Sequence, residues 1–408
     1  METTTTRTGV AAGPAAARRL PLLDVLRGVA ILGTLGTNVW IFTAPGGDIA
    51  PLAAGTPLVP LDSLLTDPSL SGIAEVLLRF AANGKFLALL TVLFGVGLAI
   101  QFRSAARRGD RWPGRYRWRA LFLLFEGAVH FTLVFAWDVL MGYAVTALIV
   151  AWLLPRSRVV QRVALWGSGA FHVIAMTALT VVLVAAARSE PGGGDASAVE
   201  DPVVALYAQG GYLDLVAFRL ANVAVLRAEM VVALPLMVCL FLVGVRLFRA
   251  GAFDPGASGR RIRTRMLVWG VGAGLPLNLA TTLAGPDFFL LDRYVAAPVL
   301  AIGYIGLVGV VMDRVRRPGP LTHGLSALGR TALSGYVAQN VACMLLCYGF
   351  GLGLAERMAG SGPWWVLGLW AAVSLLLVVA ASLWLRRFSQ GPLEAVQKWT
   401  LARLPSAS

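Results

Sequence analysis

The 408-residue sequence is poor in charged residues and in the residue types that usually bind metals or form disulfides. Asp, Glu, Lys and Arg make up 14% of it, whereas soluble domains contain about 25%. The three cysteines, Cys239, Cys343 and Cys347, lie inside apolar runs and imply no disulfide framework. There is no zinc-ligand spacing, haem signature, Walker motif or Gly-x-Gly-x-x-Gly after a strand. These absences argue against a disulfide-stabilised scaffold and against zinc, haem and nucleotide sites.

Long apolar stretches are what the sequence has instead. Hydrophobic residues make up 57% of the chain, and the mean hydropathy is +0.73. Several runs of about 18 or more apolar residues are long enough to cross a bilayer. The first run is too long for a secretory signal and is predicted to be a retained signal-anchor helix. We predict an all-α integral membrane bundle of about ten transmembrane helices, at residues 23–43, 84–103, 119–136, 139–154, 163–187, 229–248, 265–284, 293–312, 330–350 and 364–385.

The net charge of +14 is distributed in a way that indicates lipid rather than nucleic acid as partner. Arginines cluster in short stretches between apolar runs, at 103–119, 155–162, 246–265 and 314–330. With ten spans, all these stretches fall on one side, and basic loops usually face the cytoplasm and its anionic lipids. The pattern predicts a multi-pass protein of the cell (plasma) membrane with both termini in the cytoplasm.

A single transmembrane bundle is predicted over residues 20–388. Residues 1–19 are polar and low in complexity, which indicates a disordered cytoplasmic N-terminus. Residues 389–408 are predicted to form a cytoplasmic interfacial helix and tail. Amphipathic helical spacing predicts three interfacial helices, at residues 71–83, 211–229 and 392–404. Ser71 is the expected N-cap of the first.

The first span carries a polar stripe formed by Asp24, Arg27, Thr34 and Asn38. These residues fall within about 80° of one helix face. Such a stripe should face protein or water, because lipid cannot satisfy it. Arg27, oriented by Asp24, is either a contact for an anionic substrate group or half of an interfacial ion pair. Asn38 is predicted to hydrogen-bond either a substrate or a neighbouring helix.

His130 is the sharpest candidate for a catalytic residue. It is expected near the middle of the membrane, and Glu126 lies four residues earlier on the same helix face. A carboxylate beside a buried imidazole can raise its basicity, which suits a general base for a hydroxyl or amine nucleophile. The alternative is a structural pair that joins helices.

Further candidate substrate-binding residues lie at Asp138 and Lys85. Asp138 follows Trp137 in a turn that must divide the apolar block 119–154, and it is either a helix cap or a substrate contact. Lys85 opens the second span and either extends to the interface or binds an anionic group. The charged residues at the outer edge of the later spans are interpreted as interfacial anchors, namely Arg227, Glu229, Asp292 and Arg293.

The ninth span is unusually polar. Ser334, Tyr336 and Gln339, together with Asn340, indicate a helix that faces water or substrate. His172 is interpreted as a satisfied core residue and His323 as a solvated residue of a basic loop. No metal ligands are predicted.

Five stretches together resemble one known family. LDVLRGVAILGTLGTN (residues 23–38) is similar to the opening of YeiB-like bacterial membrane proteins, with their L-D-x-x-R-G pattern and a later Asn. GKFLALLTVLFGVGLAIQF and HFTLVFAWDVLMGYA follow in the family's order. GRTALSGYVAQN and FSQGPLEAVQKW resemble its C-terminal domain of unknown function 418, with its G-P-L-E signature.

This resemblance implies membership of a wider superfamily of transmembrane acyltransferases, which includes heparan-alpha-glucosaminide N-acetyltransferase-like proteins. Those proteins use cytoplasmic acyl-CoA to acylate an acceptor within or across the membrane, with a catalytic His after the first helix. Residues 43–71 contain no His here, so His130 is the alternative for that role.

Two functions of different classes remain open. The first is a membrane acyltransferase that moves an acyl group from cytoplasmic acyl-CoA to a small-molecule or lipid-linked acceptor. His130 and Glu126 would then carry the chemistry. The second is a transporter or exporter of a small or lipid-like solute, with the same polar groups as its binding and proton site. A non-catalytic scaffold is a weaker third possibility, and an oligomer is compatible with all three.

Overall fold

A computed structural model describes residues 20–52, 59–60, 64, 68–189 and 201–403. The predicted disorder of residues 1–19 lies outside these residues. The described chain is built from helices, without strands. They are α1 (Pro21–Thr43), η1 (Gly47–Leu52), α3 (Leu70–Ala82), α4 (Lys85–Arg108), α5 (Tyr116–Leu133), α6 (Leu140–Leu153), α7 (Arg158–Ser189), α8 (Asp201–Gln209), α9 (Tyr212–Ala221), α10 (Val223–Arg249), α11 (Ala257–Leu283), η2 (Pro286–Phe288), α12 (Phe289–Leu291), η3 (Asp292–Ala296), α13 (Ala297–Arg314), α14 (Pro320–Arg330), α15 (Ala332–Cys347), α16 (Leu354–Arg357), α17 (Trp364–Arg387) and α18 (Pro392–Arg403).

The predicted all-α membrane bundle is confirmed. Each of the ten predicted spans overlaps a helix, but a count of ten crossings is not confirmed. By length and composition, seven helical stretches of the described chain could cross a membrane: Pro21–Thr43, Leu70–Arg108, Arg158–Ala186, Val223–Arg249, Ala257–Leu283, Pro286–Arg314 and Trp364–Arg387. The apolar helices α6 and α15 are shorter.

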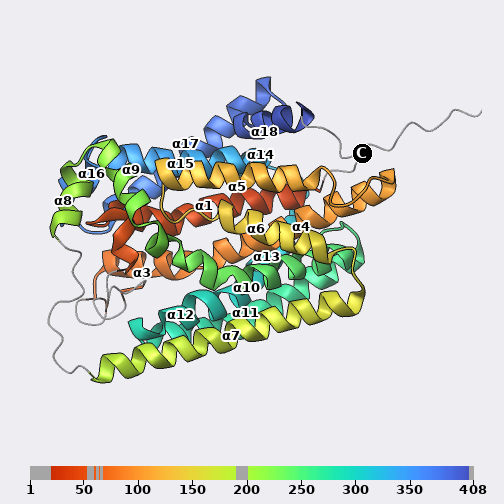
Figure 1. Cartoon of the computed structure of the whole chain (residues 1–408), viewed down its shortest axis with the longest axis horizontal. Helices are drawn as coiled ribbons and strands as arrows, with labels where there is room; N and C mark the ends of the chain where they lie inside the picture. The colour runs from red at the N-terminus through yellow and green to blue at the C-terminus, as the bar shows by residue number, and fades with distance from the viewer. Residues whose placement is uncertain (1–19, 53–58, 61–63, 65–67, 190–200, 404–408) are drawn as a thin grey trace, which may run out of the picture.

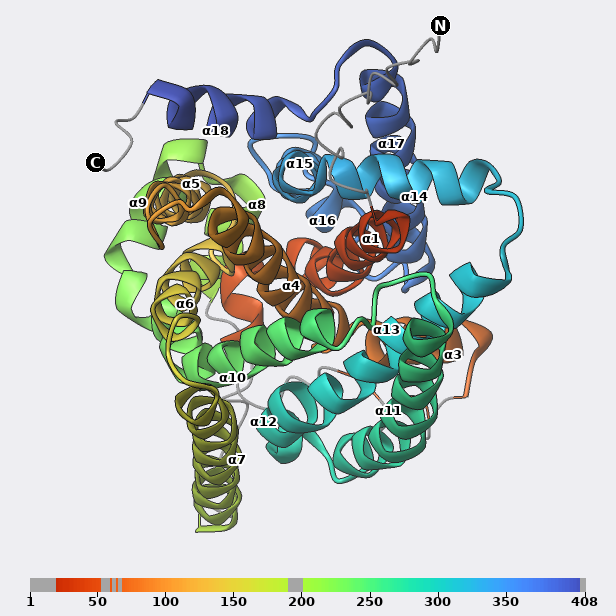
Figure 2. The same ribbon diagram turned by 90° about the vertical axis from the view of Figure 1, so that its right-hand side faces the viewer.

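The long helices run side by side along the long axis of the molecule (Figure 1). Helix α1 lies near the centre, between α4 on one side and α14, α15 and α17 on the other (Figure 2). A Cβ on Gly28 would lie 2.1 Å from the Leu325 carbonyl oxygen, and one on Gly329 would lie 1.7 Å from that of Asp24. The backbones of α1 and α14 therefore touch, which only glycine permits at these two positions.

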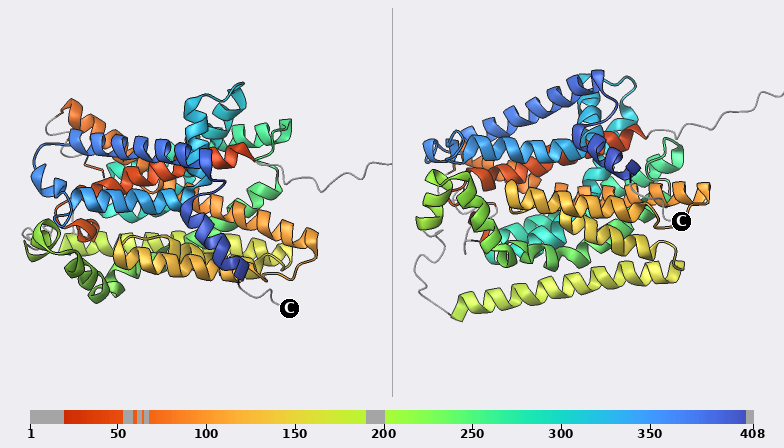
Figure 3. Two further views of the ribbon diagram at one scale, coloured as in Figure 1. Left: turned by 90° about the horizontal axis from the view of Figure 1, so that it is seen from above. Right: turned by 45° about the horizontal axis from the view of Figure 1, so that its top comes forward.

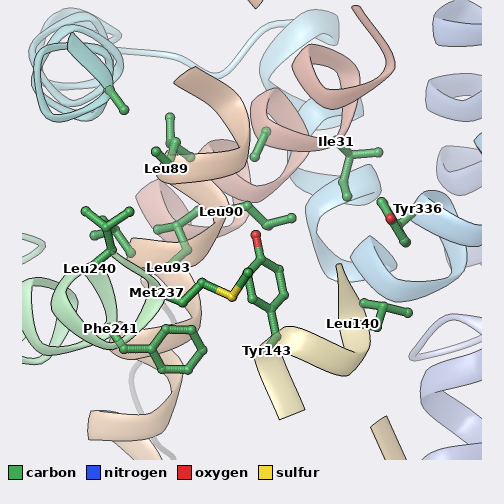
Figure 4. Packing of buried hydrophobic residues seen from close by; sticks show 14 of the residues in the cluster. Ile31, Leu89, Leu90, Leu93, Leu140, Tyr143, Met237, Leu240, Phe241 and Tyr336 are labelled. Carbon is green, nitrogen blue, oxygen red and sulfur yellow. The ribbon is translucent and has the colours of Figure 1, made fainter. Parts of the chain in front are cut away.

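Helices α10, α11 and α13 form the other half of the bundle, and α7 is its outermost helix (Figure 3). The two halves meet in an apolar core where the Tyr143 ring packs against Phe94 and Phe241 (Figure 4). Ring centroids of Phe94 and Tyr143 lie 4.5 Å apart. The Tyr143 hydroxyl donates to the Leu87 carbonyl, so α4 and α6 are also joined by a buried hydrogen bond.

One end of the bundle, here named the capped end, carries η1, α8, α9 and α16 (Figure 1). Asp48, fully buried in η1, holds this end together. Its carboxylate accepts from Arg219 Nε at 2.8 Å, from the Tyr207 hydroxyl at 3.0 Å and from the Tyr348 hydroxyl at 3.3 Å. Burial and the charge of Asp48 raise the pKa of the Tyr207 phenol, which therefore remains a neutral donor. The opposite end, here named the basic end, carries the arginine-containing loops after α4, α6 and α13.

The amphipathic segments differ in detail from the predictions. Ser69, rather than Ser71, caps α3, since its hydroxyl accepts from the Gly72 amide at 3.1 Å. The segment 211–229 is divided between α9 and the first residues of α10, so it is not one interfacial helix. His323 is exposed as predicted, but it lies on α14 rather than in a loop. The predicted C-terminal helix is present as α18.

Candidate functional site

A chain of buried hydrogen bonds crosses the bundle at His130. His130 Nδ1 lies 3.0 Å from Asp138 Oδ1, and the exposed fractions of the two side chains are 2% and 0%. On the other side of the ring, Nε2 lies 3.2 Å from Asn340 Nδ2. Asn340 Oδ1 in turn accepts from Asn38 Nδ2 at 3.1 Å. The chain joins four elements: the turn before α6, then α5, α15 and α1.

Asp138 is held in place by the turn between α5 and α6. The second oxygen of its carboxylate accepts from the Met141 amide at 3.1 Å, so Asp138 also caps the start of α6. Arg227 of α10 donates to the carbonyls of Ala136 at 2.9 Å and Asp138 at 2.6 Å. These bonds satisfy carbonyls that the helix end leaves free, which is required away from water. Arg227 is therefore a buried clamp on this turn, and its prediction as an interfacial anchor was wrong.

The hydrogen-bond partners assign the state of the His130 ring. An ionised carboxylate only accepts, so Nδ1 carries the proton and donates to Asp138. Nε2 is then the acceptor for the Asn340 amide, whose oxygen accepts from Asn38. A neutral imidazole with its lone pair on Nε2 satisfies every member of this chain. An O–H or N–H group that replaced the Asn340 amide would meet that lone pair directly.

Helix α15 brings two more predicted residues to this centre. The Tyr336 ring, on the turn before Asn340, lies 5.3 Å from the His130 ring between centroids. Gln339 Nε2 donates to Thr34 Oγ1 at 3.3 Å. The outer half of the α1 stripe, Thr34 and Asn38, therefore faces α15, and Asn38 reaches His130 through Asn340. Of the two alternatives for Asn38, the structure has the bond to a neighbouring helix.

The expected pair of Glu126 with His130 is wrong. Both ring nitrogens of His130 are engaged by Asp138 and Asn340. Glu126 lies one turn nearer the basic end, and its two carboxylate oxygens are buried without a hydrogen-bond partner among the described residues. The four-residue spacing on one helix predicted Glu126 as the partner of His130. Instead, the turn after α5 brings Asp138 next to the His130 ring.

Ser334 also lies apart from the His130 centre. Its hydroxyl bonds to the Glu394 carboxylate, and it accepts from the Leu393 amide at 3.0 Å. Glu394 accepts from the Leu333 amide at 2.9 Å, which caps the start of α15. The G-P-L-E stretch thus fastens α18 to α15, the helix that carries Asn340.

Asp24 and Arg27 form the predicted ion pair at the basic end of α1, with 3.4 Å between Arg27 Nη1 and Asp24 Oδ1. The Arg27 side chain is 31% exposed. It interacts electrostatically with Arg119 of α5, which is also exposed. Two cations on neighbouring helices at this end form a surface to which anions are attracted.

Lys85 belongs to a different polar centre. Its side chain is fully buried at the start of α4, and its Nζ lies 4.4 Å from the centroid of the Phe80 ring. Its charged neighbours are Asp292 and Arg293. In the described chain no hydrogen bond or ion pair joins this centre to His130. Because the Lys85 side chain is fully buried, the alternative in which it extends to the interface was wrong.

Known proteins are similar to this chain over most of its length. The model of a family described as "Protein of unknown function (DUF418)" matches residues 247–403. Uncharacterized protein YxaH of Bacillus subtilis (strain 168) is 25% identical over 391 residues, covering 92% of this chain and 92% of its own length. Uncharacterized protein YeiB of Escherichia coli (strain K12) is 29% identical over 394 residues, covering 91% and 93%. These matches support a YeiB-like protein with a DUF418 region at residues 247–403. No solved structure matches it.

The DUF418 region contributes only part of the candidate site. It contains α11 to α18 and so supplies Tyr336, Asn340 and Glu394. His130, Asp138 and Asn38 precede it, although the YeiB-like relatives match over both parts. The hydrogen-bond chain therefore joins the DUF418 region to the rest of the protein.

Several participants were missed or undervalued in the sequence. The polar character of Asn340 is visible in the sequence but its contact with His130 is not, and Arg227 was interpreted as an edge charge. The available signal was an ionisable or amide side chain bordering a long apolar run, which is costly unless it has a partner. Within the described residues, no group of three or more His, Cys, Asp or Glu side chains is arranged to hold a metal ion.

Proposed function

We propose that the protein is an integral-membrane acyltransferase in which His130 is the general base. The observation that carries this proposal is the buried pair of His130 and Asp138, with 3.0 Å between Nδ1 and Oδ1. A carboxylate at Nδ1 fixes the tautomer and stabilises the imidazolium that forms when Nε2 takes a proton. The resemblance of the first helix to those of transmembrane acyltransferases supports the same chemistry.

The proposed reaction is a single acyl transfer from the thioester to the acceptor. His130 Nε2 takes the proton of an acceptor hydroxyl or amine while the acceptor atom bonds to the acyl carbon. The thioester C–S bond breaks, and the imidazolium returns the proton to the departing thiolate. Asn340 orients the acceptor, because its amide holds the position that the acceptor must occupy beside Nε2, and Asn38 positions the Asn340 amide.

The acyl-CoA donor would approach from the basic end. Arg27 and Arg119, both accessible there, would attract its phosphates. In this proposal the basic end and both chain termini face the cytoplasm of a bacterial cell membrane, and the acceptor reaches His130 from the capped end. Charge and accessibility at the basic end support this part of the proposal.

A transporter is the second candidate, and Glu126 is the observation that favours it. A buried carboxyl group without a hydrogen-bond partner inside a helix bundle is a common element of proton-coupled carriers. Proton-coupled solute flux without release of free CoA would support this alternative.

The test is an acyl-transfer assay with purified protein in liposomes of bacterial total lipid. Radiolabelled acyl-CoAs of short and long chain length are supplied at either face, and labelled product and free thiol are measured. We expect His130→Ala to lower turnover about 10²–10⁴-fold. His323→Ala, the same change at an exposed histidine of α14, should leave turnover unchanged. Equal turnover in His130→Ala and wild type would remove His130 from the mechanism.

A further inference from the structure

A second set of buried polar atoms without partners surrounds η3, a single turn of π-helix at Asp292–Ala296. The atoms are Lys85 Nζ, Asn278 Oδ1 and His172 Nδ1, on α4, α11 and α7. The exposed fractions of these side chains are 0% for Lys85, 0% for Asn278 and 1% for His172. Turns of π-helix occur often at functional sites. The proposed acyl transfer uses none of these residues.

Asp292 is the hub of this centre. Its Oδ1 accepts from Asn278 Nδ2 at 2.6 Å and from the hydroxyls of Thr281 at 2.9 Å and Thr282 at 2.7 Å. Its Oδ2 accepts from Asn83 Nδ2 at 3.0 Å. Neutral donors therefore stabilise the carboxylate fully, without a direct ion pair.

The other carboxylate of the centre is also satisfied. Glu229 of α10 accepts from the Tyr294 hydroxyl and from Arg293 Nη2, the latter at 3.4 Å. Arg293 Nη1 donates to Asn83 Oδ1 at 2.9 Å. His172 meets the same turn, since its Nε2 lies 3.2 Å from the Tyr294 carbonyl.

Lys85 is held at the edge of this network by its backbone. Gly84, which precedes it, has φ of +72°, and a Cβ there would lie 2.7 Å from the Arg293 carbonyl oxygen. The close approach of this backbone to η3 fixes where the Lys85 side chain begins. Lys85 Nζ lies 4.4 Å from the centroid of the Phe80 ring. It has no hydrogen-bond acceptor among the described residues.

An ammonium in this position needs an anionic oxygen. Burial of a charge without a hydrogen-bond partner is strongly unfavourable, and a cation–π contact offsets only part of the cost. Neither Asp292 nor Glu229 lies within hydrogen-bond or ion-pair distance of the ammonium, so neither supplies this partner. We propose that Lys85 is the anchor of a second ligand site, which takes an anion of the phosphate class.

The neighbouring atoms refine the class of ligand. Asn278 Oδ1 is a free acceptor at the same turn, because Nδ2 of the same amide already donates to Asp292. It favours an anion that also carries an O–H group. Monoprotonated inorganic phosphate and the headgroup of phosphatidylglycerol share this chemistry.

The experiment measures thermal unfolding of delipidated full-length protein in detergent. One arm adds inorganic phosphate, and the other adds phosphatidylglycerol, with phosphatidylcholine as its control. At about 100-fold excess over Kd, the matching anion should raise the Tm of wild type by about 4 °C or more. Lys85→Met should lose this rise and Lys85→Arg should keep much of it. Arg108→Met, which removes an exposed cation of the same helix, should respond as wild type does.

The two arms separate the two sources of the ligand. A rise with phosphate alone assigns a free anion, and a rise with phosphatidylglycerol alone assigns a lipid headgroup. An equal rise in Lys85→Met and wild type, or no rise with either anion, overturns the proposal. If Lys85→Met does not fold, native mass spectrometry compares wild type with Lys85→Gln. Equal retention of the anionic species by both, or retention by neither, overturns the proposal in the same way.

Discussion

The His130 centre and the Lys85 centre are two polar clusters inside one helix bundle, and their buried polar groups are hydrogen-bonded in different arrangements. Around His130, single hydrogen bonds link Asp138, the imidazole, Asn340 and Asn38 in series. Around Lys85, four donors converge on Asp292 while the ammonium stays without a partner. A chain that ends in an imidazole suits proton uptake, because His130 Nε2 can take a proton while Nδ1 stays bonded to Asp138. Several donors on one carboxylate, as at Asp292, stabilise its negative charge in a fixed position.

Helix α10 separates the two centres. Arg227 holds the turn that carries Asp138, and Glu229, almost opposite on the same helix, binds Arg293 and Tyr294 of the Lys85 centre. Residues two positions apart on a helix point about 200° apart. The start of α10 thus supports two sites that share no hydrogen bond in the described chain, and mutations should separate them.

The largest effect on stability is expected from Asp292→Ala. Four donors, of which the amides of Asn83 and Asn278 are buried, would lose an acceptor at once, so we expect the free energy of unfolding to fall by about 3–5 kcal/mol. Denaturant unfolding in detergent measures it. Asp287→Ala, at an exposed position of the preceding turn, should change stability by less than about 0.5 kcal/mol. Similar losses in both variants would mean that Asp292 is not a hub.

Asp138→Asn should affect activity rather than folding. The amide can still cap α6, but it no longer stabilises an imidazolium and can hold the wrong tautomer. We expect turnover to fall about 10²-fold or more with a small change in KM, measured as initial rates over a pH series. Asp110→Asn, in an exposed ion pair with Arg108, is the matched control. A wild-type rate in Asp138→Asn would show that Asp138 has only a capping role.

Asn38→Ala should have the smallest effect, because Asn38 is the last member of the series. One lost hydrogen bond should cost about 1 kcal/mol of stability and lower turnover about tenfold or less. Asn222→Ala is the control, since the Asn222 side-chain amide donates to the Phe218 carbonyl within its own helix region. The same two measurements on it give the loss of stability and turnover expected from removing an amide away from the His130 centre. A larger loss of turnover than in Asp138→Asn would reverse the proposed order of the chain.

Much of the fold could be predicted because apolar length is a local property. The turn between α5 and α6 followed from the excessive length of the block 119–154, and the helix α18 followed from Pro392 and its amphipathic spacing. The count of crossings could not be predicted as securely. Helices α6 and α15 are shorter than a usual span, and the turn before α6 and Tyr348 after α15 are buried in protein.

The site was predicted residue by residue but not as an arrangement. His130, Asp138 and Asn38 were each singled out because polar groups in apolar spans are costly. Glu126 was chosen as the partner of His130 because helical spacing is visible in a sequence, whereas the return of the chain to Asp138 is not. Lys85 was predicted either to extend to the interface or to bind an anionic group, because the sequence does not show that its side chain is buried.

The sequence by itself determined that this protein is a helical membrane bundle and that its few buried polar residues need partners, because both follow from composition and from the cost of polar groups in lipid. Only the tertiary structure decided which partners they have. Hydrogen bonds between α1, α5, α15 and the turn before α6 depend on distances across the bundle, and these are set by helix packing over long separations in the chain. The same packing places Lys85 beside Asp292 and Arg293, in a polar centre of its own.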